Sequence, residues 1–243
     1  MFMKEHNCKC ENCKHFNNEP CPKKVPIFGG LSKDEIQKIA LMTKHLHFQK
    51  GQILLQEGEK SDQLFIINKG QVKISKFTIH GKEQILYLMA DGDFFGELNL
   101  FHSDEVNNFS VYAIEDTEVC ILTKSDIDQI MEDNPEISLK LLKAVTKRLA
   151  HAENLAQNLA TKDPEVRIAS MILEFSQKFG KKKKDGILIE LPVTREEAAS
   201  YVGVTRETIS RKFSKFEDLG IISLSGNKHL FVKNQFALEE YIQ

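Results

Sequence analysis

The sequence predicts an α+β protein in which an N-terminal antiparallel β-roll is joined by a long helix to a C-terminal winged helix-turn-helix. Short β-rich segments between about His45 and Leu122 predict the roll. Apolar residues that recur every three or four positions after Pro135 predict the long helix. Two short helical segments on either side of Gly203 predict the C-terminal unit.

These segments divide the chain into four parts. Residues 1–24 form a cysteine-rich arm, 25–124 the β-roll, 125–160 the region of the long helix and 161–243 the winged helix-turn-helix. A chain of 243 residues is long enough for two small domains, so this division is reasonable on length alone.

The composition is that of an ordinary globular protein, with 41% hydrophobic and 28% charged residues. A net charge of −2 excludes a uniformly basic nucleic-acid coat but leaves room for a local basic face. Because no apolar run approaches the ~18 residues of a membrane span and no signal peptide is evident, we expect a cytoplasmic protein with no membrane partner. No phosphate loop, zinc-protease motif or Ser-His-Asp arrangement is evident, so the sequence does not predict an enzyme.

The β-rich runs are four to seven residues long and are separated by glycines, which is typical of a small antiparallel roll. The separating glycines are Gly51, Gly58, Gly70, Gly81 and Gly92. An apolar segment, Val25–Phe28, precedes the β-rich runs. A capping box from Ser32 to Glu35 predicts a short helix between this segment and the first of those runs.

Helical text follows the roll. Ser125 is expected to cap a short helix, and Pro135 stands at the first turn of a long one. Its apolar positions recur almost as a heptad seam, which predicts a dimerisation helix and therefore a homodimer. The seam residues are Leu141, Val145, Arg148, Ala152, Leu155 and Leu159. An ordinary amphipathic helix that packs on the roll remains the alternative.

A further helix is expected from Pro164 to about Phe179, followed by four lysines, 181–184, in a solvated loop. Thr194 opens another capping box, Gly203 permits a tight turn, and Thr205 caps a second helix that reaches about Leu219. The runs 221–224 and 229–232 around Ser225-Gly226-Asn227 predict a hairpin, which would form the wing.

The second helix has two distinct faces. Ile209, Phe213 and Phe216 lie on an apolar face, and polar residues crowd the opposite face near the N-terminus. Arginine can bind guanine through two hydrogen bonds, and glutamate can accept one from the amino group of cytosine. The sequence therefore predicts that this helix reads double-stranded DNA. The predicted DNA-binding residues are Thr205, Arg206, Glu207, Ser210, Arg211, Lys212 and Lys215.

With these motifs the sequence resembles the CRP/FNR family of bacterial transcription regulators. The resemblance covers nearly the whole chain and is carried by the roll text Met89–Leu98 and by the run Glu207-Thr208-Ile209-Ser210-Arg211. It implies a cyclic-nucleotide-binding-like β-roll and a homodimeric regulator, such as an activator. It also implies an inverted-repeat DNA site related to TTGAT or TGTGA half-sites, and contact with RNA polymerase.

Family members that bind cyclic nucleotides hold the ribose with a glutamate and the phosphate with an Arg-Ser pair about ten residues later. Glu97 matches the first position, but Asn107-Asn108 stands at the second. A buried phosphodiester without an arginine lacks its charge-assisted hydrogen bonds. We therefore do not expect a cyclic nucleotide as the effector.

The five cysteines predict the sensing chemistry, since a reducing cytoplasm disfavours structural disulfides. FNR-type members of the family hold a 4Fe–4S cluster with three N-terminal cysteines and one in the roll. By this resemblance Cys10, Cys13, Cys21 and Cys120 would be the ligands, with Cys8 as a possible substitute. Oxygen or redox state would then be the signal.

Two departures from the FNR pattern leave the ligand set open, namely the extra Cys8 and a gap of seven residues before Cys21. Other readings remain. The four N-terminal cysteines could bind zinc, a cysteine pair could form a reversible disulfide, a different small molecule could be the effector, or Cys120 could be a plain core residue. FNR-type sensors also tend to carry an acidic residue in the dimer seam, where this chain has Ala152.

Overall fold

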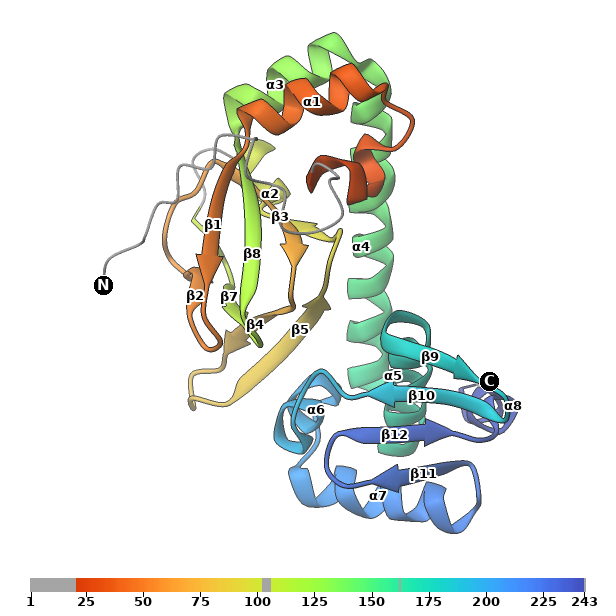
Figure 1. Ribbon diagram of the computed structural model, residues 1–243. Helices are drawn as coiled ribbons and strands as arrows, with labels where there is room; N and C mark the ends of the chain where they lie inside the picture. The colour runs from red at the N-terminus through yellow and green to blue at the C-terminus, as the bar shows by residue number, and fades with distance from the viewer. Residues whose placement is uncertain (1–20, 102–105, 162, 243) are drawn as a thin grey trace. The chain divides into compact units, whose positions relative to one another are not determined.

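The computed structural model describes residues 21–101, 106–161 and 163–242 (Figure 1). The chain forms two compact units. The N-terminal unit takes the chain up to Lys76 together with Leu86–Leu149, and the C-terminal unit takes Phe77–Ile85 and Ala150–Gln243. Cys8, Cys10 and Cys13 lie outside the described residues.

Within the described residues, the predicted β-roll is confirmed as two four-stranded antiparallel sheets. The first sheet has the strand order β1 (Lys44–Phe48), β8 (Thr117–Thr123), β3 (Gln63–Lys69) and β6 (Phe94–Phe95). The second has the order β2 (Ile53–Leu55), β7 (Ser110–Ala113), β4 (Val72–Phe77) and β5 (Glu83–Met89).

Strand β3 reads as a continuous apolar run because both of its faces are buried. Phe65 and Ile67 belong to the core inside the roll, whereas Leu64 and Ile66 belong to a second apolar cluster. Strand β8 divides in the same way, and Cys120 points into the second cluster. We call this second cluster the helix-side cluster, because it also contains residues of the helices that cover the sheet.

Within the described residues, six helical segments belong wholly or partly to the N-terminal unit. They are η2 (Cys21–Lys24), η3 (Pro26–Phe28), α1 (Lys33–Met42), α2 (Glu97–Phe101), α3 (Lys124–Asp133) and α4 (Pro135–Thr161), of which α4 continues into the C-terminal unit. Helices α1 and α3, both drawn at the top of Figure 1, each contribute residues to the helix-side cluster. The capping box of α1 is confirmed, with Ser32 and Glu35 bonded reciprocally.

The predicted cap of α3 at Ser125 was wrong by two residues. The Thr123 side chain accepts the Asp126 N–H, and Asp126 accepts the Thr123 N–H in return. This reciprocal pair satisfies two donors at the helix start, so the helix begins at Lys124. Both Thr123 and Ser125 can cap a helix, and each is followed three residues later by a carboxylate, Asp126 or Asp128, so the local pattern does not distinguish them.

The long helix α4 is confirmed, but the predicted seam does not form one exposed stripe. Leu141 is only 4% exposed and belongs to the helix-side cluster, so it cannot be part of an exposed dimer seam. Val145, Arg148 and Leu155 are half-buried and Ala152 is exposed. Among the described side chains of α4, the exposed large apolar ones are instead Leu139, Leu142 and Leu149, and the side chain of Leu159 lies outside the described residues. The stripe is thus rotated around the helix from the predicted one.

The C-terminal unit is a winged helix-turn-helix, as predicted. Its elements are α5 (Pro164–Phe179), β9 (Gly180–Lys183), β10 (Gly186–Glu190), α6 (Arg195–Val202), α7 (Arg206–Asp218), β11 (Ile222–Ser225), β12 (His229–Val232) and α8 (Gln235–Glu240). The strands form one sheet in the order β11-β12-β10-β9. Strands β11 and β12 form the predicted hairpin, and Ser225 and His229 are the paired residues nearest its turn.

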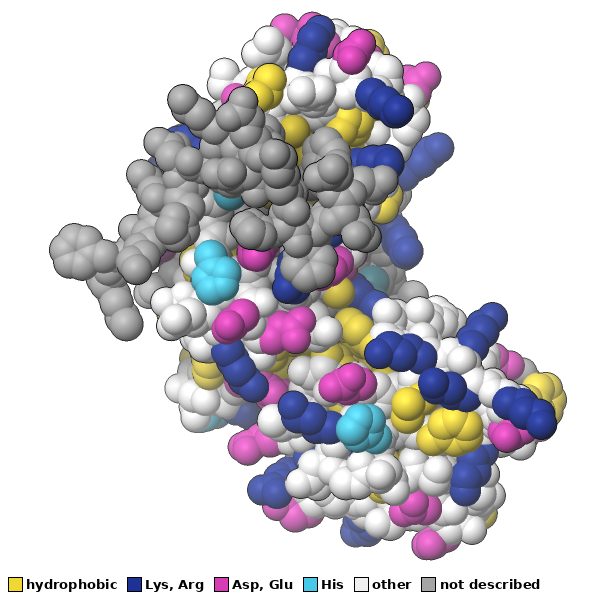
Figure 2. All heavy atoms as spheres, viewed as in Figure 1, with side chains coloured by type: hydrophobic (Ala, Val, Ile, Leu, Met, Phe, Trp, Pro, Cys, Tyr) yellow, Lys and Arg dark blue, Asp and Glu magenta, His cyan; other side chains and the backbone are white. Residues whose placement is uncertain are grey.

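The lysine run is not the predicted loop. Lys181, Lys182 and Lys183 form β9, an edge strand that pairs with β10, and only Lys184 lies in the turn. Their side chains are exposed, and Figure 2 shows dark-blue side chains where β9 and β10 lie in Figure 1. Lysines on an edge strand discourage pairing with a strand of another molecule, because their charge must stay in water.

Candidate DNA-binding surface and sensor-domain site

The turn between α6 and α7 has the geometry that the sequence predicts. Gly203 ends α6 in the left-handed conformation with φ of 69°, and its N–H donates to the Ala199 carbonyl. Thr205 then caps α7, and its hydroxyl oxygen accepts the Thr208 N–H at 3.3 Å. A left-handed residue between two helices turns the chain sharply, which sets the two helices at an angle to each other.

The apolar face of α7 is buried as predicted, with Ile209, Phe213 and Phe216 almost inaccessible. Arg195, at the start of α6, adds a contact that sequence reasoning missed. Its guanidinium lies 4.2 Å from the centre of the Phe213 ring, which is a cation–π arrangement. Burial lowers the pKa of Arg195, while the charge of Glu217 opposes this shift. The contact links the first helix of the motif to the second.

The polar face of α7 is open to solvent. Thr205, Arg206, Glu207, Ser210 and Arg211 are all exposed. A hydrogen bond from its own backbone N–H, one from Thr205 and the charge of Arg206 lower the pKa of Glu207. The carboxylate is therefore ionised at neutral pH and is purely an acceptor, next to arginines that are purely donors. This combination can read both bases of a G·C pair.

Lys212 and Lys215 have a different environment from the other predicted residues. Both ammonium groups bond the carboxylate of Glu165, near the start of α5. Lys215 remains about half-exposed, whereas Lys212 is largely covered. The two lysines lie on the predicted helix, but Glu165 already binds both. Nothing in the local sequence indicates this contact, since Glu165 and Lys212 are 47 positions apart.

In the roll, Glu97 is buried and pairs with Arg148 of α4. The other nitrogen of the Arg148 fork donates to the Phe94 carbonyl, and the guanidinium lies 4.7 Å from the centre of the Phe94 ring. The second oxygen of Glu97, Oε2, has no hydrogen-bond partner among the described residues. Arg148, which the sequence placed in the dimer seam, therefore holds α4 against the roll.

Asn107 stands at the position where the family resemblance would require a phosphate-binding arginine, and its side chain has a structural role. It is buried, its amide donates to the Glu59 carbonyl at 2.7 Å, and its carbonyl accepts from Asn99. These bonds tie the segment before β7 to α2 and to the loop after β2. They use one amide donor and the acceptor of Asn107, and the neutral side chain brings no positive charge to offset a phosphate.

Cys120 is 0% exposed, and its sulfur lies 3.4 Å from Nδ1 of His45 on the neighbouring strand. Cys21 begins η2, the first described element. Among the residues that the structure describes, no group of three or more His, Cys, Asp or Glu side chains is placed to hold a metal ion. Of the predicted cluster ligands, only the side chain of Cys120 is therefore located.

Comparison with known proteins agrees with this architecture. Residues 45–134 match the cyclic nucleotide-binding domain model, and residues 166–241 match the Crp-like helix-turn-helix domain model. The CRP-like cAMP-activated global transcriptional regulator of Mycobacterium tuberculosis is 30% identical over 84% of this chain and 91% of its own length. The cAMP-activated global transcriptional regulator CRP of Salmonella typhimurium is 33% identical over 82% of this chain and 95% of its own.

The chain belongs to the CRP/FNR family. The structure of FixK2 from Bradyrhizobium japonicum superposes with a TM-score of 0.74 at 25% identity, covering 84% of this chain and 98% of that one. As a CRP/FNR protein the chain is a DNA-binding transcription regulator and not an enzyme, and its helix-turn-helix is the part that binds DNA. Within the described residues, no helix is both long and apolar enough to cross a membrane.

The reading face of α7 can be tested with Glu207→Ala. We expect this substitution to relax the base preference at one position of each half-site and to cost about 1–3 kcal/mol of binding there. Selection of binding sites from a random duplex pool measures both effects. Ser214→Ala, at another exposed position of α7, is the control and should keep the preference. An unchanged preference in Glu207→Ala would show that another face reads the bases.

Proposed function

We propose that this CRP/FNR protein is a homodimeric regulator that senses oxygen or redox state through a 4Fe–4S cluster. Cys10, Cys13, Cys21 and Cys120 would be the ligands, with Cys8 as a substitute. Cysteine thiolates are the usual ligands of such clusters, and when bound the cluster supplies oxygen-sensitive redox chemistry. The observation that carries the proposal is the position of Cys120 relative to the segment that follows the cysteine-rich arm.

Cys120 lies in the helix-side cluster, and so do Val25, Ile27 and Phe28. These three residues follow Cys21 by only four to seven positions. The Lys24 side chain also reaches the roll, where its ammonium donates to the Asn68 carbonyl at 3.1 Å. The base of the arm is thus anchored in the same cluster as the roll cysteine, which supports a ligand set drawn from both.

The same cluster offers a route from the arm to the long helix. Ile137 and Leu141 of α4 belong to it, and the Lys140 ammonium donates to the Gly29 carbonyl. Residues 25–29 therefore lie against α4 as well as near Cys120. Release of the arm would loosen the packing of α4. The resulting shift of α4 between two packed positions would pass along that helix.

A homodimer is the second part of the proposal. Leu142 and Leu149 are 59% and 58% exposed and stand one heptad apart on α4, which is the spacing of a coiled-coil seam. Pairing of two α4 helices would place two α7 helices on an inverted-repeat site. CRP/FNR regulators typically act as dimers that contact RNA polymerase, and we propose the same for this chain.

A cyclic nucleotide is the second candidate effector. Two relatives are named as cAMP-activated, and Glu97 retains an oxygen without a described partner in the roll. Against it stands Asn107, whose side chain carries no charge to offset a phosphate. We therefore rank this candidate below the cysteine-based sensor.

The cysteine ligands can be tested by comparing Cys120→Ser with Cys8→Ser, both purified without oxygen. We expect the wild type and Cys8→Ser to be brown, with iron and sulfide in a 4Fe–4S ratio, and Cys120→Ser to be colourless. In gel shifts on an inverted-repeat promoter fragment, oxygen should change the affinity of the wild type but not that of Cys120→Ser.

Other outcomes separate the alternatives. A colourless wild type with stoichiometric zinc would contradict the cluster. A colourless, metal-free wild type whose DNA binding responds to dithiothreitol would favour a thiol switch. A wild type whose affinity changes on addition of cyclic AMP, but not of oxygen, would favour the nucleotide.

The dimer can be tested with Leu149→Asp, with Leu41→Asp on exposed α1 as the control. An aspartate in an apolar seam would be buried without a partner. We therefore expect the Kd of the dimer to rise about tenfold or more, and a tenfold rise corresponds to about 1.4 kcal/mol. Sedimentation velocity at micromolar concentration measures this.

Because Ala152 adds no charge to the helix, the wild type should remain dimeric even without a cluster, and a cluster-free wild type that sediments as a monomer would contradict this.

A further inference from the structure

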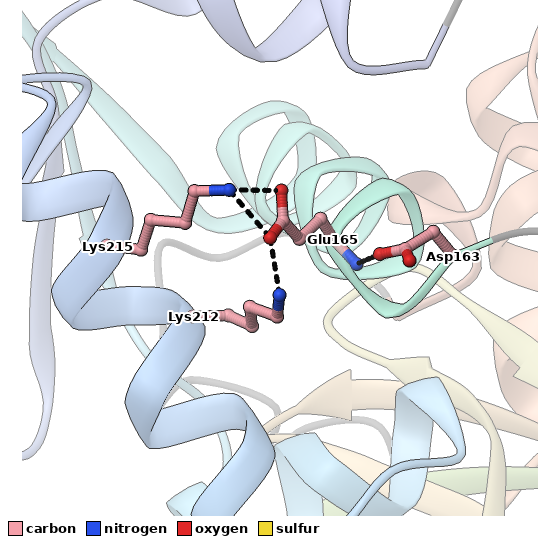
Figure 3. A network of polar contacts seen from close by, with 4 residues as sticks. All are labelled: Asp163, Glu165, Lys212 and Lys215. Carbon is pink, nitrogen blue, oxygen red and sulfur yellow. Dashed lines mark hydrogen bonds and ion pairs between the residues drawn. The ribbon is translucent and has the colours of Figure 1, made fainter.

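Glu165 stands where two lysines of the DNA-binding helix converge (Figure 3). The Lys215 ammonium lies 2.7 and 2.8 Å from its two carboxylate oxygens, and Lys212 bonds the first of these oxygens. The Glu165 side chain is 16% exposed, so one half-buried carboxylate holds two ammonium groups.

The backbone holds Glu165 in place for this contact. It is the second residue of α5, after Pro164, and its N–H donates to the Asp163 side chain at 2.7 Å. A carboxylate in the first turn of a helix is also favoured by the helix dipole. Hydrogen bonds from Lys212 and then Lys215 lower the pKa of Glu165, and its bond to Glu165 raises the pKa of Lys215. Glu165 and Lys215 are therefore both charged at neutral pH.

The lysines are close to the residues that read DNA. Lys212 follows Arg211 directly, and Lys215 lies one helical turn after Arg211. Lysines beside a recognition helix are suited to phosphate contacts, which supply sequence-independent affinity. Here the carboxylate cancels one of the two positive charges, and a phosphate would have to compete with it for both ammonium groups.

We propose that Glu165 is an internal counter-ion that competes with the DNA backbone for Lys212 and Lys215. It thereby sets how strongly, and with what salt dependence, this regulator holds any duplex. The proposal rests on the role of α7 in DNA binding and is independent of the cysteines. Glu165 does not touch bases in this account, since it acts only through the two lysines.

The test is Glu165→Gln in the full-length protein, which removes the charge and keeps the size. Fluorescence anisotropy is measured with a selected inverted repeat and a scrambled duplex at several salt concentrations. We expect several-fold tighter binding to both duplexes. The slope of log K against log salt should steepen by about one or two, since each new phosphate contact adds about 0.9. Glu190→Gln, an exposed glutamate on β10, carries the same change of net charge and should have little effect.

A double-mutant cycle separates competition from a structural role. If Glu165 competes with phosphate, Lys215→Gln should weaken DNA binding by a larger factor in the Glu165→Gln background than in the wild type, because Glu165 no longer holds Lys215 there. A Glu165→Gln protein that unfolds at lower temperature, with unchanged or weaker DNA binding and an unchanged salt slope, would overturn the proposal. Glu165→Ala, which also frees both lysines, must give the same steeper slope as Glu165→Gln.

Discussion

Burial of strands β3 and β8 on both faces is the constraint on which the rest of the N-terminal unit depends. One face of each strand closes the core of the roll, and the other requires an apolar cover of its own. Helices α1, α3 and the first half of α4 supply that cover together with Val25, Ile27 and Phe28. The segment that follows the cysteine-rich arm, the roll cysteine and the first half of α4 are therefore packed in one cluster. Close packing transmits small displacements, because such a core has few alternative arrangements.

The roll matches only part of the cyclic-nucleotide pattern that the family resemblance implies. Glu97 and Arg148 form a buried ion pair between the roll and α4. Removing either partner would leave an uncompensated charge, so the pair is costly to lose whatever the effector is. Asn107 has no such charge and bonds neighbouring backbone instead. A site with this combination suits a structural role for Glu97 and Arg148, which leaves sensing to the cysteines in our proposal.

Local signals in the sequence predicted much of the fold and of the DNA-binding face. The caps at Thr194 and Thr205 and the turn at Gly203 depend on neighbours within a few residues, so they could be read directly. Contacts between distant residues could not. Three features depend on tertiary packing, which overrides periodicity and composition. They are the burial of Leu141, the pairing of β9 with β10 and the bonds of Glu165 to Lys212 and Lys215. The cap of α3 was misplaced because two residues with equal intrinsic capacity stood two positions apart.

In the proposed sensor, a change at the cysteine ligands is transmitted to α4 through residues 25–29. Hydrogen exchange on the full-length protein tests it most directly, comparing the anaerobically purified form with the same sample after exposure to oxygen. We expect faster exchange in residues 25–29 and in the first half of α4, because both share the helix-side cluster. The amides of α7 should keep their protection, since the helix-turn-helix has its own core. Unchanged protection in the first half of α4, in a sample whose DNA affinity does change with oxygen, would contradict the account.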